Sequence, residues 1–451
     1  MTRPNFLIIS IDSLRHDFCS FLNENENTMR FLDDFAGQST VYERAISPSV
    51  WTLPVHTSIF TGLYPTEHQI NDGETILGDH PTFAELLSEA GYETRSFTHN
   101  DWFRTAEMAR GFEHEHTRMP GMIDNGITNI RNGAKDLAYE RVKKGITQVL
   151  EAPLVKARKA VFRHQLKGSR TVSNSISRLK ESSSPFCYMI HLNDVHHAYR
   201  PHISYYREFG TEGLRTLHKN VLYQQKLKNN REAIYTGNFK IDQKRLPLIK
   251  DLYRASILQT DRLIERLVNT LSEIGESENT VVIVFGDHGD LIGEEESFGH
   301  SFSVADELIR VPLLVRDPSG QLKPGRRQSI AQLNDIYPTV LELAGETPPE
   351  TNSISLLDDS RNAAFVHFDK TGQEWEFPRS AYPPFRQHAI WKSTDSKLVY
   401  YPDEDREAEE SNSRLRPELD KHFGRLNPVP TKGEARLSED IQQQLKSMGY
   451  L

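Results

Sequence analysis

Four short apolar runs constrain the fold of this chain more than any other feature of its sequence. They span Phe6–Ile11, Phe186–Leu192, Thr280–Phe285 and Val311–Val315. Each run is apolar on both alternating faces, which is the pattern of a strand covered on both sides by helices. Helical patterns lie between the runs, at about 27–37, 53–61, 82–90, 248–274 and 334–344. Strands that alternate with helices predict an α/β fold with a large, mostly parallel central sheet sandwiched by helices.

The texture of the sequence changes after residue 345. Short strand-like pieces follow, at Ala364–Phe368, His388–Trp391 and Lys397–Tyr401. An acidic stretch and a last amphipathic helix at about 437–447 complete the chain. We therefore expect two parts, a main domain over residues 1–345 and a smaller C-terminal subdomain with an antiparallel sheet over residues 346–451.

Residues 131–180 differ from the rest of the main domain because they carry thirteen Lys or Arg against three Asp or Glu. Their apolar residues recur at roughly helical spacing around Tyr139–Val161, so we interpret the segment as a basic helical insertion. One interpretation is a solvated basic face. The other is a surface that contacts an anionic membrane as a peripheral protein, or an extended polyanion.

Composition limits the partners and the compartment. The formal net charge is −9, with 63 acidic and 54 basic residues, so we expect no nucleic-acid partner. An anionic substrate must then be held locally, by a metal or a helix terminus. The two cysteines, Cys19 and Cys187, belong to no C-x-x-C motif, which argues against a disulfide framework. The first apolar run is too short for a secretory signal and no run suggests a transmembrane segment, so we predict a cytoplasmic protein.

Polar residues follow three of the apolar runs at the point where each ends. Asp12 follows the first, Asp287 and His288 follow the third, and His196 and His197 come shortly after the second. In parallel α/β sheets, ligands bind beyond the carboxyl ends of the strands. Each piece has an ordinary alternative: a helix cap at Asp12, a turn at Asp287, a hydrogen-bonded loop at the histidine pair. Their coincidence favours a site for a divalent cation, because carboxylates and imidazoles are common ligands.

A further motif surrounds Thr52. Thr52 is a good N-cap and Pro54 suits a first helical turn, so the ordinary interpretation is a capped helix. A helix N-terminus is also an anion site, and a hydroxyl placed there beside a cation is deprotonated more easily. His56 lies four residues on, on the same helix face, where it could orient the Thr52 oxygen.

These residues carry a resemblance. The segments Asn5–Asp17, Trp51–Pro65 and Val284–Asp290 resemble the sulfatase family of the alkaline-phosphatase superfamily. Supporting matches lie at Ala90–Thr94, Gly299–Ser301, Asp306–Pro312, Asp335–Gly345 and Leu445–Leu451. The matches follow the order of the family from residue 5 to the last residue. The segments 131–180 and 205–245 lie outside the resemblance.

The resemblance implies a metal-dependent hydrolase of phosphate-type or sulfate esters that acts on a small anionic substrate. It implies one divalent metal ion (Mn, Ca, Mg or Zn), bound by Asp12, Asp287 and His288 with Thr52 completing the shell. His196 and His300 match histidines on the substrate side, where they would act in catalysis with Thr52 and His56. The substrate-binding candidates are His99, Asn100 and His197, with His99 and Asn100 standing where the family places an anion-binding Lys or Asn.

Departures from the family pattern bear on the subclass. Sulfatases of the formylglycine type have Cys or Ser at the place of Thr52 and Arg at the place of His56, and Ser13 replaces a second Asp. The result is similar to phosphonate monoester and phosphodiester hydrolases, so we expect a Thr nucleophile, a covalent intermediate and a phosphate-type substrate. The alternatives are a sulfatase without formylglycine, a phosphoglycerol- or phosphoethanolamine-type transferase and, least favoured, a non-catalytic binding protein. The oligomeric state is left open.

Overall fold

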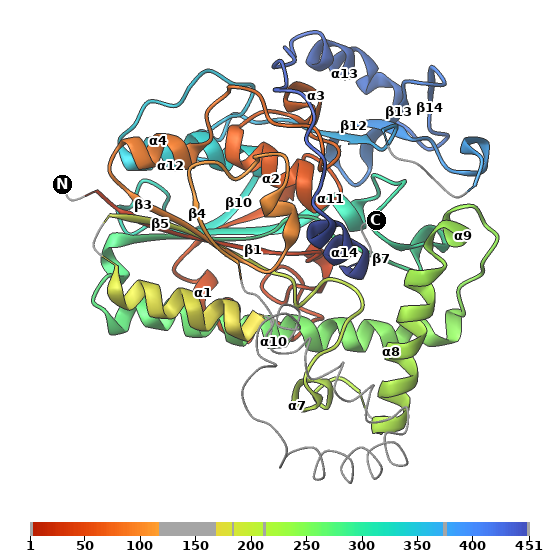
Figure 1. Ribbon diagram of the computed structural model, residues 1–451, viewed down its shortest axis with the longest axis horizontal. Helices are drawn as coiled ribbons and strands as arrows, with labels where there is room; N and C mark the ends of the chain where they lie inside the picture. The colour runs from red at the N-terminus through yellow and green to blue at the C-terminus, as the bar shows by residue number, and fades with distance from the viewer. Residues whose placement is uncertain (1–2, 117–167, 183–184, 211–212, 373–376, 449–451) are drawn as a thin grey trace, which may run out of the picture.

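The computed structural model describes residues 3–116, 168–182, 185–210, 213–372 and 377–448. A large sheet with helices on both faces forms the main part of the molecule, and a smaller sheet lies at one end of it (Figure 1). This arrangement confirms the expected α/β fold with its separate antiparallel sheet in the C-terminal part. The boundary at residue 345 stays a prediction.

The large sheet has eight strands. Their order across the sheet is β10 (Gly325–Gln332), β2 (Thr40–Ile46), β9 (Arg310–Arg316), β6 (Thr280–Gly286), β1 (Asn5–Ile11), β5 (Phe186–Leu192), β3 (Glu93–Thr98) and β4 (Glu113–His116). Strand β1 is parallel to both of its neighbours, β5 and β6, and β9 is antiparallel to β2 and β6. Strands β1, β5 and β6 are buried along their whole length, as expected for strands covered on both faces.

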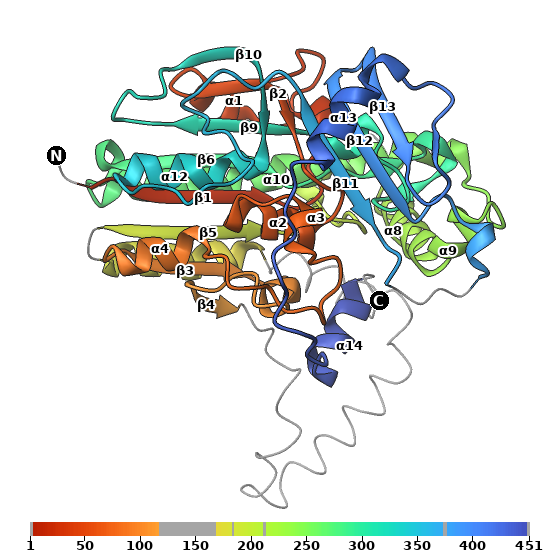
Figure 2. The same cartoon turned by 90° about the horizontal axis from the view of Figure 1, so that it is seen from above.

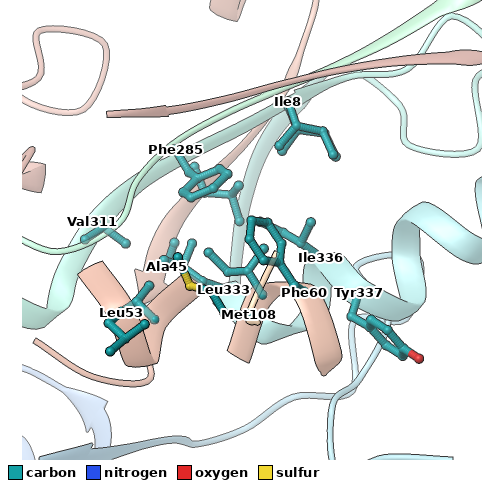
Figure 3. Close-up of a cluster of buried hydrophobic side chains, with 14 of the residues drawn as sticks. Ile8, Ala45, Leu53, Phe60, Met108, Phe285, Val311, Leu333, Ile336 and Tyr337 are labelled. Atoms are coloured by element: carbon teal, nitrogen blue, oxygen red, sulfur yellow. The ribbon is translucent and has the colours of Figure 1, made fainter. Parts of the chain in front are cut away.

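Helices cover the two faces of this sheet. One face carries α2 (Thr52–Thr61), α4 (Phe83–Glu89) and α12 (Ile336–Ala344), and the other carries α1 (Arg30–Ala36) and α10 (Leu246–Glu273) (Figures 1 and 2). The alternation along β1 divides the core accordingly, because Ile8 packs with the α2 side and Ile9 with the α10 side. Figure 3 shows the first of these cores, where Ile8 and Phe285 of the sheet face Phe60 of α2.

The smaller elements connect these layers. They are α3 (Pro65–His68), α7 (Ile203–Tyr206), α8 (Leu214–Asn229), α9 (Arg231–Tyr235), α11 (Asp306–Ile309), and the short strands β7 (Leu291–Ile292) and β8 (Phe298–Gly299). The C-terminal sheet is antiparallel and consists of β11 (Ala364–Asp369), β12 (Arg386–Ser393), β13 (Ser396–Tyr401) and β14 (Arg406–Glu407). Helix α13 (Arg416–Phe423) packs on this sheet, and α14 (Glu439–Met448) returns to the main part, where Asp440 lies 3.5 Å from Arg104.

The basic segment lies mostly outside the described residues. Residues 131–167 are not described, whereas residues 168–181 form a helix whose Val172 and Leu179 are buried in the core on the α10 side. This described end of the segment therefore packs against the main part. In the portion of the chain that the structure describes, no helix has the length and apolarity to cross a membrane. Cys19 and Cys187 are buried free thiols.

The N-terminus of α1 is capped from another helix. Both carboxylate oxygens of Asp261, in the middle of α10, accept hydrogen bonds from α1, one from the N–H of Phe31 at 2.8 Å and one from that of Leu32 at 3.0 Å. Burial raises the pKa of Asp261 to about 6. The carboxylate satisfies two N–H groups that the first turn of α1 leaves without an intrahelical partner, and it connects two helices on one face of the sheet.

We expect Asp261→Ala to lower the free energy of unfolding by about 1–3 kcal/mol, because two buried N–H groups lose their acceptor. Urea unfolding followed by circular dichroism measures this change. Glu265→Ala is the matched control, since Glu265 lies on the same helix and only forms a partly exposed ion pair with Arg262. Equal stability of the two variants would contradict the capping role.

Candidate metal centre and active site

The central strands end together at one edge of the sheet. Ile11, the last residue of β1, is in register with Leu192 of β5 and Gly286 of β6. The main chain continues this alignment, since the N–H of Asp12 donates to Leu192 O at 2.9 Å and that of Asp287 donates to Ile11 O at 3.2 Å. The parallel strands therefore deliver two carboxylates to one point.

Asp12, Asp287 and His288 form a buried group suited to a metal ion. One ligand atom from each residue lies within 4.8 Å of the others, and all three side chains are fully buried. The Nε2 atom of His288 is 3.6 Å from Asp12 Oδ1 and 3.7 Å from Asp287 Oδ1. Asp287 Oδ2 and His288 Nε2 have no hydrogen-bond partner among the described residues. Buried ligand atoms without partners, in a set of two carboxylates and an imidazole, fit a divalent cation.

The pKa values of these groups show the electrostatic conflict at the site. Burial raises the pKa of Asp287 to about 6. Burial also acts to raise the pKa of Asp12, but the attraction of His196 and His191 outweighs it, so that this pKa falls well below its ordinary value. Burial opposes a charge on His288, yet the two carboxylates outweigh it and raise the His288 pKa. A positive charge between the two carboxylates would stabilise the ionised form of both.

Neighbouring donors hold the two carboxylates in place. The hydroxyl of Ser13 donates to Asp12 Oδ1 at 3.0 Å, and the N–H of Ser13 donates to Asp287 Oδ1 at 3.0 Å. The side-chain amide of Asn193 donates to Asp12 Oδ2, and that of Asn100 lies 3.4 Å from the same oxygen. Ser13 has a positive φ of 60°. This conformation directs its N–H and its hydroxyl to different carboxylates.

Thr52 begins helix α2 beside this group. The expected N-cap role of Thr52 is wrong: Trp51 has the extended N-cap conformation (φ −157°, ψ 159°) and Thr52 is the first helical residue. The difference is one position, so Thr52 still lies at the N-terminus of the helix. His56 Nδ1 is 2.9 Å from the backbone oxygen of Thr52 and 3.8 Å from Asp287 Oδ2. The hydrogen bond from His56 thus reaches the main chain of Thr52, one turn away.

A chain of hydrogen bonds connects His56 to β5. Burial lowers the pKa of His56 well below its ordinary value, so the imidazole is neutral. Its Nδ1–H then donates to Thr52 O, and its Nε2 accepts from the Ser10 hydroxyl at 3.0 Å. The Ser10 oxygen lies 3.1 Å from His191 Nδ1, and His191 Nε2 lies 3.4 Å from Asp12 Oδ2. The start of α2 is therefore connected through three side chains to a candidate metal ligand.

His191 was missed by sequence reasoning. It lies inside an apolar run, opposite Ser10 in the pairing of β1 with β5. Together with His56 and Asp287 it forms a second group whose ligand atoms lie within 4.8 Å. The sequence did offer one indication, because Ser10 and His191 each interrupt an otherwise apolar run, Phe6–Ile11 and Phe186–Leu192.

Three further histidines lie next to this group. One ring nitrogen from each of His196, His197 and His300 lies within 4.8 Å of the others, and the ring centroid of His300 is 4.5 Å from that of His288. Asp290 orients two of them, with its Oδ1 2.7 Å from His300 Nδ1 and its Oδ2 3.2 Å from His197 Nδ1. Burial lowers the pKa of His300 to about 4 and the pKa of His196 well below its ordinary value, so these two imidazoles are neutral.

Asp290 ends the Val284–Asp290 motif but was not among the predicted site residues, and the structure gives it a positioning role. Burial acts to raise its pKa, yet His197 and His300 lower the pKa well below the ordinary value, so the group is anionic. It also accepts a hydrogen bond of 2.8 Å from the hydroxyl of Tyr199. His99 lies buried just beyond β3, and Asn100 contacts Asp12, so the structure brings the residues expected at the site close to the same strand ends.

The sequence model of the sulfatase family matches residues 4–346. The chain belongs to the sulfatase family. Its curated relatives include an N-acetylglucosamine-6-O-sulfatase of Bacteroides thetaiotaomicron, 23% identical over 98% of this chain and 87% of the relative. An arylsulfatase of Clostridium perfringens is 26% identical over 80% of each chain.

Solved structures place this sulfatase-family chain in the alkaline-phosphatase-like fold. A phosphonate monoester hydrolase from Silicibacter pomeroyi superposes with a TM-score of 0.69 at 16% identity, covering 96% of this chain and 99% of that structure. The family match and the curated relatives show that the chain is an ester-hydrolysing enzyme of the sulfatase family. Enzymes of this superfamily use a divalent metal, and the buried Asp–Asp–His group is a candidate place for it.

We expect His288→Ala and Asp12→Asn to weaken binding of a divalent metal by more than about tenfold, because each removes one of few buried ligands. Enzyme loaded with Mn²⁺ and passed through a desalting column should retain about one equivalent by elemental analysis. Asp359→Asn, which alters an exposed carboxylate paired with Arg327, should retain as much metal as the unaltered enzyme. Full retention of metal in the two site variants would refute this assignment.

Asp290→Asn should lower kcat by about 10–100-fold while the metal content stays unchanged, because the substitution removes a charge that orients His197 and His300. Steady-state kinetics and elemental analysis on the same preparation separate the two effects. A loss of metal in parallel with activity would mean that Asp290 supports the metal group and not the histidines.

Proposed function

We propose that this enzyme hydrolyses phosphate-type esters, phosphonate monoesters and phosphodiesters among them, with Thr52 as the nucleophile. The observation that carries the proposal is the position of Thr52 at the first turn of α2, where His56 Nδ1 joins its backbone oxygen to the surroundings of Asp287. The N–H groups of this turn and its positive dipole end favour an anion. We expect the Thr52 hydroxyl to lie next to both this anion site and the candidate metal group.

Asp12, Asp287 and His288 would hold one divalent cation, with the Thr52 oxygen completing the shell. Such a cation would supply Lewis-acid stabilisation of negative charge on the substrate and would lower the pKa of the Thr52 hydroxyl. The mixed oxygen and nitrogen set is compatible with Mn, Ca, Mg or Zn. Only two carboxylates would hold this single cation, because Ser13 stands at the place of the family's additional Asp and donates a hydrogen bond to Asp12 instead of adding a charge.

Thr52 gives up its hydroxyl proton to solvent and attacks the phosphorus in line, so that a new O–P bond forms and the bond to the leaving alcohol breaks. His196 or His300 donates the proton that the alcohol requires, and water then hydrolyses the phosphothreonine. Burial keeps the pKa of His300 at about 4 in the free protein. Its protonation therefore depends on the negative charge of a bound substrate, which raises the pKa of a neighbouring imidazole. His99, Asn100 and His197 would contact the substrate.

The residue types at the site favour a phosphate-type over a sulfate substrate. Threonine is not the residue that is oxidised to formylglycine, so that route is closed at position 52. Two carboxylates instead of three leave more net positive charge for a phosphoryl group, which carries more negative charge than a sulfuryl group. The second candidate function is a sulfatase without formylglycine, which is favoured by the names of the curated relatives. A phosphoglycerol- or phosphoethanolamine-type transferase and a non-catalytic binding protein follow in that order.

Thr52→Ala should lower kcat/KM by roughly 10³-fold or more, because the covalent route is lost, whereas Thr52→Ser retains a hydroxyl and should keep part of the activity. Initial rates with chromogenic phosphate mono- and diesters, phosphonates and sulfates in Mn²⁺, Mg²⁺, Ca²⁺ or Zn²⁺ measure both variants. Mass spectrometry should find an unmodified threonine, and a phosphoryl adduct with a slow substrate. Sulfate esters turned over at least as efficiently as every phosphoester would overturn the phosphate preference.

Two further expectations from the sequence stay predictions. The cytoplasmic location rests on two buried thiols that form no disulfide. Contact of the basic segment 131–180 with an anionic membrane or polyanion concerns residues that are mostly outside the described part of the chain.

A further inference from the structure

Strand β11 of the C-terminal sheet lies against the segment that leads into Thr52. The N–H of His367 donates to Pro48 O at 2.9 Å, and the Ser49 hydroxyl donates to His367 O at 2.8 Å. The His367 ring also lies 2.8 Å from the hydroxyl of Thr66 in α3. Figure 2 shows β11 beside α3. Residues just beyond β11 therefore reach the neighbourhood of the nucleophile.

Lys370 is the residue that follows β11, and its ammonium lies over the indole ring of Trp51, 3.3 Å from the centroid. Trp51 directly precedes Thr52, so their Cα atoms are about 3.8 Å apart. Both side chains are almost completely buried, with 6% of Lys370 and 2% of Trp51 exposed. The amino group of Lys370 is thus held against the residue that directly precedes the proposed nucleophile.

The carboxylates nearest to Lys370 are already used elsewhere. Asp369 accepts from Arg386 Nε at 3.0 Å and from the N–H of Thr371 at 2.8 Å. Asp72 accepts from the N–H groups of Glu74 and Thr75. In the part of the chain that the structure describes, Lys370 forms no ion pair within 4.0 Å with either carboxylate. Burial and then the positive charge of Arg231 lower the pKa of Lys370, so the charged form lacks compensation inside the protein.

The indole adds a second donor of the same kind. Trp51 Nε1 is buried and has no hydrogen-bond partner among the described residues. An ammonium and an indole N–H are donors only, so the two groups together lack an acceptor. The attraction between Lys370 and the Trp51 ring offsets only part of the desolvation of an ammonium. An anion bound between these two groups would accept a hydrogen bond from each and would compensate the charge of the ammonium.

We propose that Lys370 and Trp51 form a subsite for a second anionic group of the substrate, carried by the alcohol portion of the ester that Thr52 attacks. The subsite rests on the proposed function of Thr52, and it adds a substrate class: compact alcohols, such as a sugar or an aromatic ring, that carry a carboxylate, sulfate or phosphate beside the ester. Because Trp51 and Thr52 are adjacent in the chain, we expect both anionic groups to lie on one ring or on adjacent groups. Lys370 is then a specificity-determining residue.

Calorimetric titration of Mn²⁺-loaded enzyme with non-hydrolysable phosphonates tests the subsite. The probes are benzylphosphonate, 3-carboxybenzylphosphonate and 3-sulfobenzylphosphonate, and the quantity compared is the ratio of their dissociation constants. The unaltered enzyme should bind at least one of the doubly charged probes about tenfold or more tightly than benzylphosphonate. The carboxylate and sulfonate probes distinguish which anionic group the subsite prefers.

Lys370→Met should reduce this preference to within about twofold, and Lys370→Arg, which keeps the charge, should retain most of it. Lys392→Met is the matched control, because Lys392 is a lysine of the same subdomain that pairs with Glu418 on the surface. No preference in the unaltered enzyme, or an undiminished preference in Lys370→Met, overturns the subsite. Because binding of the phosphonates requires no turnover, failure of Thr52 as nucleophile would appear separately, as unimpaired hydrolysis by Thr52→Ala.

Discussion

The repulsion between two buried carboxylates governs the architecture of this site. Asp12 and Asp287 follow adjacent parallel strands, and the alignment of those strands holds the two side chains close together. Neither carboxylate is exposed, so water cannot screen the repulsion. The hydrogen bonds from Ser13 and the nearby imidazole of His288 stabilise this arrangement, and a cation bound between the carboxylates would stabilise it further. Helices on both faces of the sheet make the burial possible.

The histidines around this pair are arranged by the same constraint. Burial keeps His56 and His300 neutral, and neutral imidazoles can transmit orientation through one donor and one acceptor each. His56 uses both of its ring nitrogens to connect α2 to β1. Asp290 orients His300 through a hydrogen bond to Nδ1 of its ring. The site thereby concentrates negative charge at a few carboxylates, while His56, His196 and His300 are uncharged.

Much of the fold and part of the candidate site could be predicted from local sequence. The buried strands, the helices between them and the residues at the strand ends follow from apolar periodicity and from the rule that ligands lie beyond parallel strands. His191 could not be found this way, because its importance depends on the register that places it opposite Ser10. Lys370 depends on the docking of a strand from another sheet, which no local pattern encodes. Thr52 was expected to be the N-cap of α2, whereas the N-cap is Trp51 and the helix begins at Thr52. Helix boundaries depend on backbone angles that side-chain preferences specify only loosely.

The docking of β11 on the segment before Thr52 has a consequence for the order in which the enzyme is completed during synthesis. The contact between Ser49 and His367 joins residues 318 positions apart. The large sheet is complete in the nascent chain before β11, the strand that docks on the segment preceding Thr52, has been synthesised. Contacts of such long sequence separation form late in folding. Thr52, the proposed nucleophile, thus has this contact beside it only after most of the polypeptide has been synthesised, and products truncated before β11 lack it.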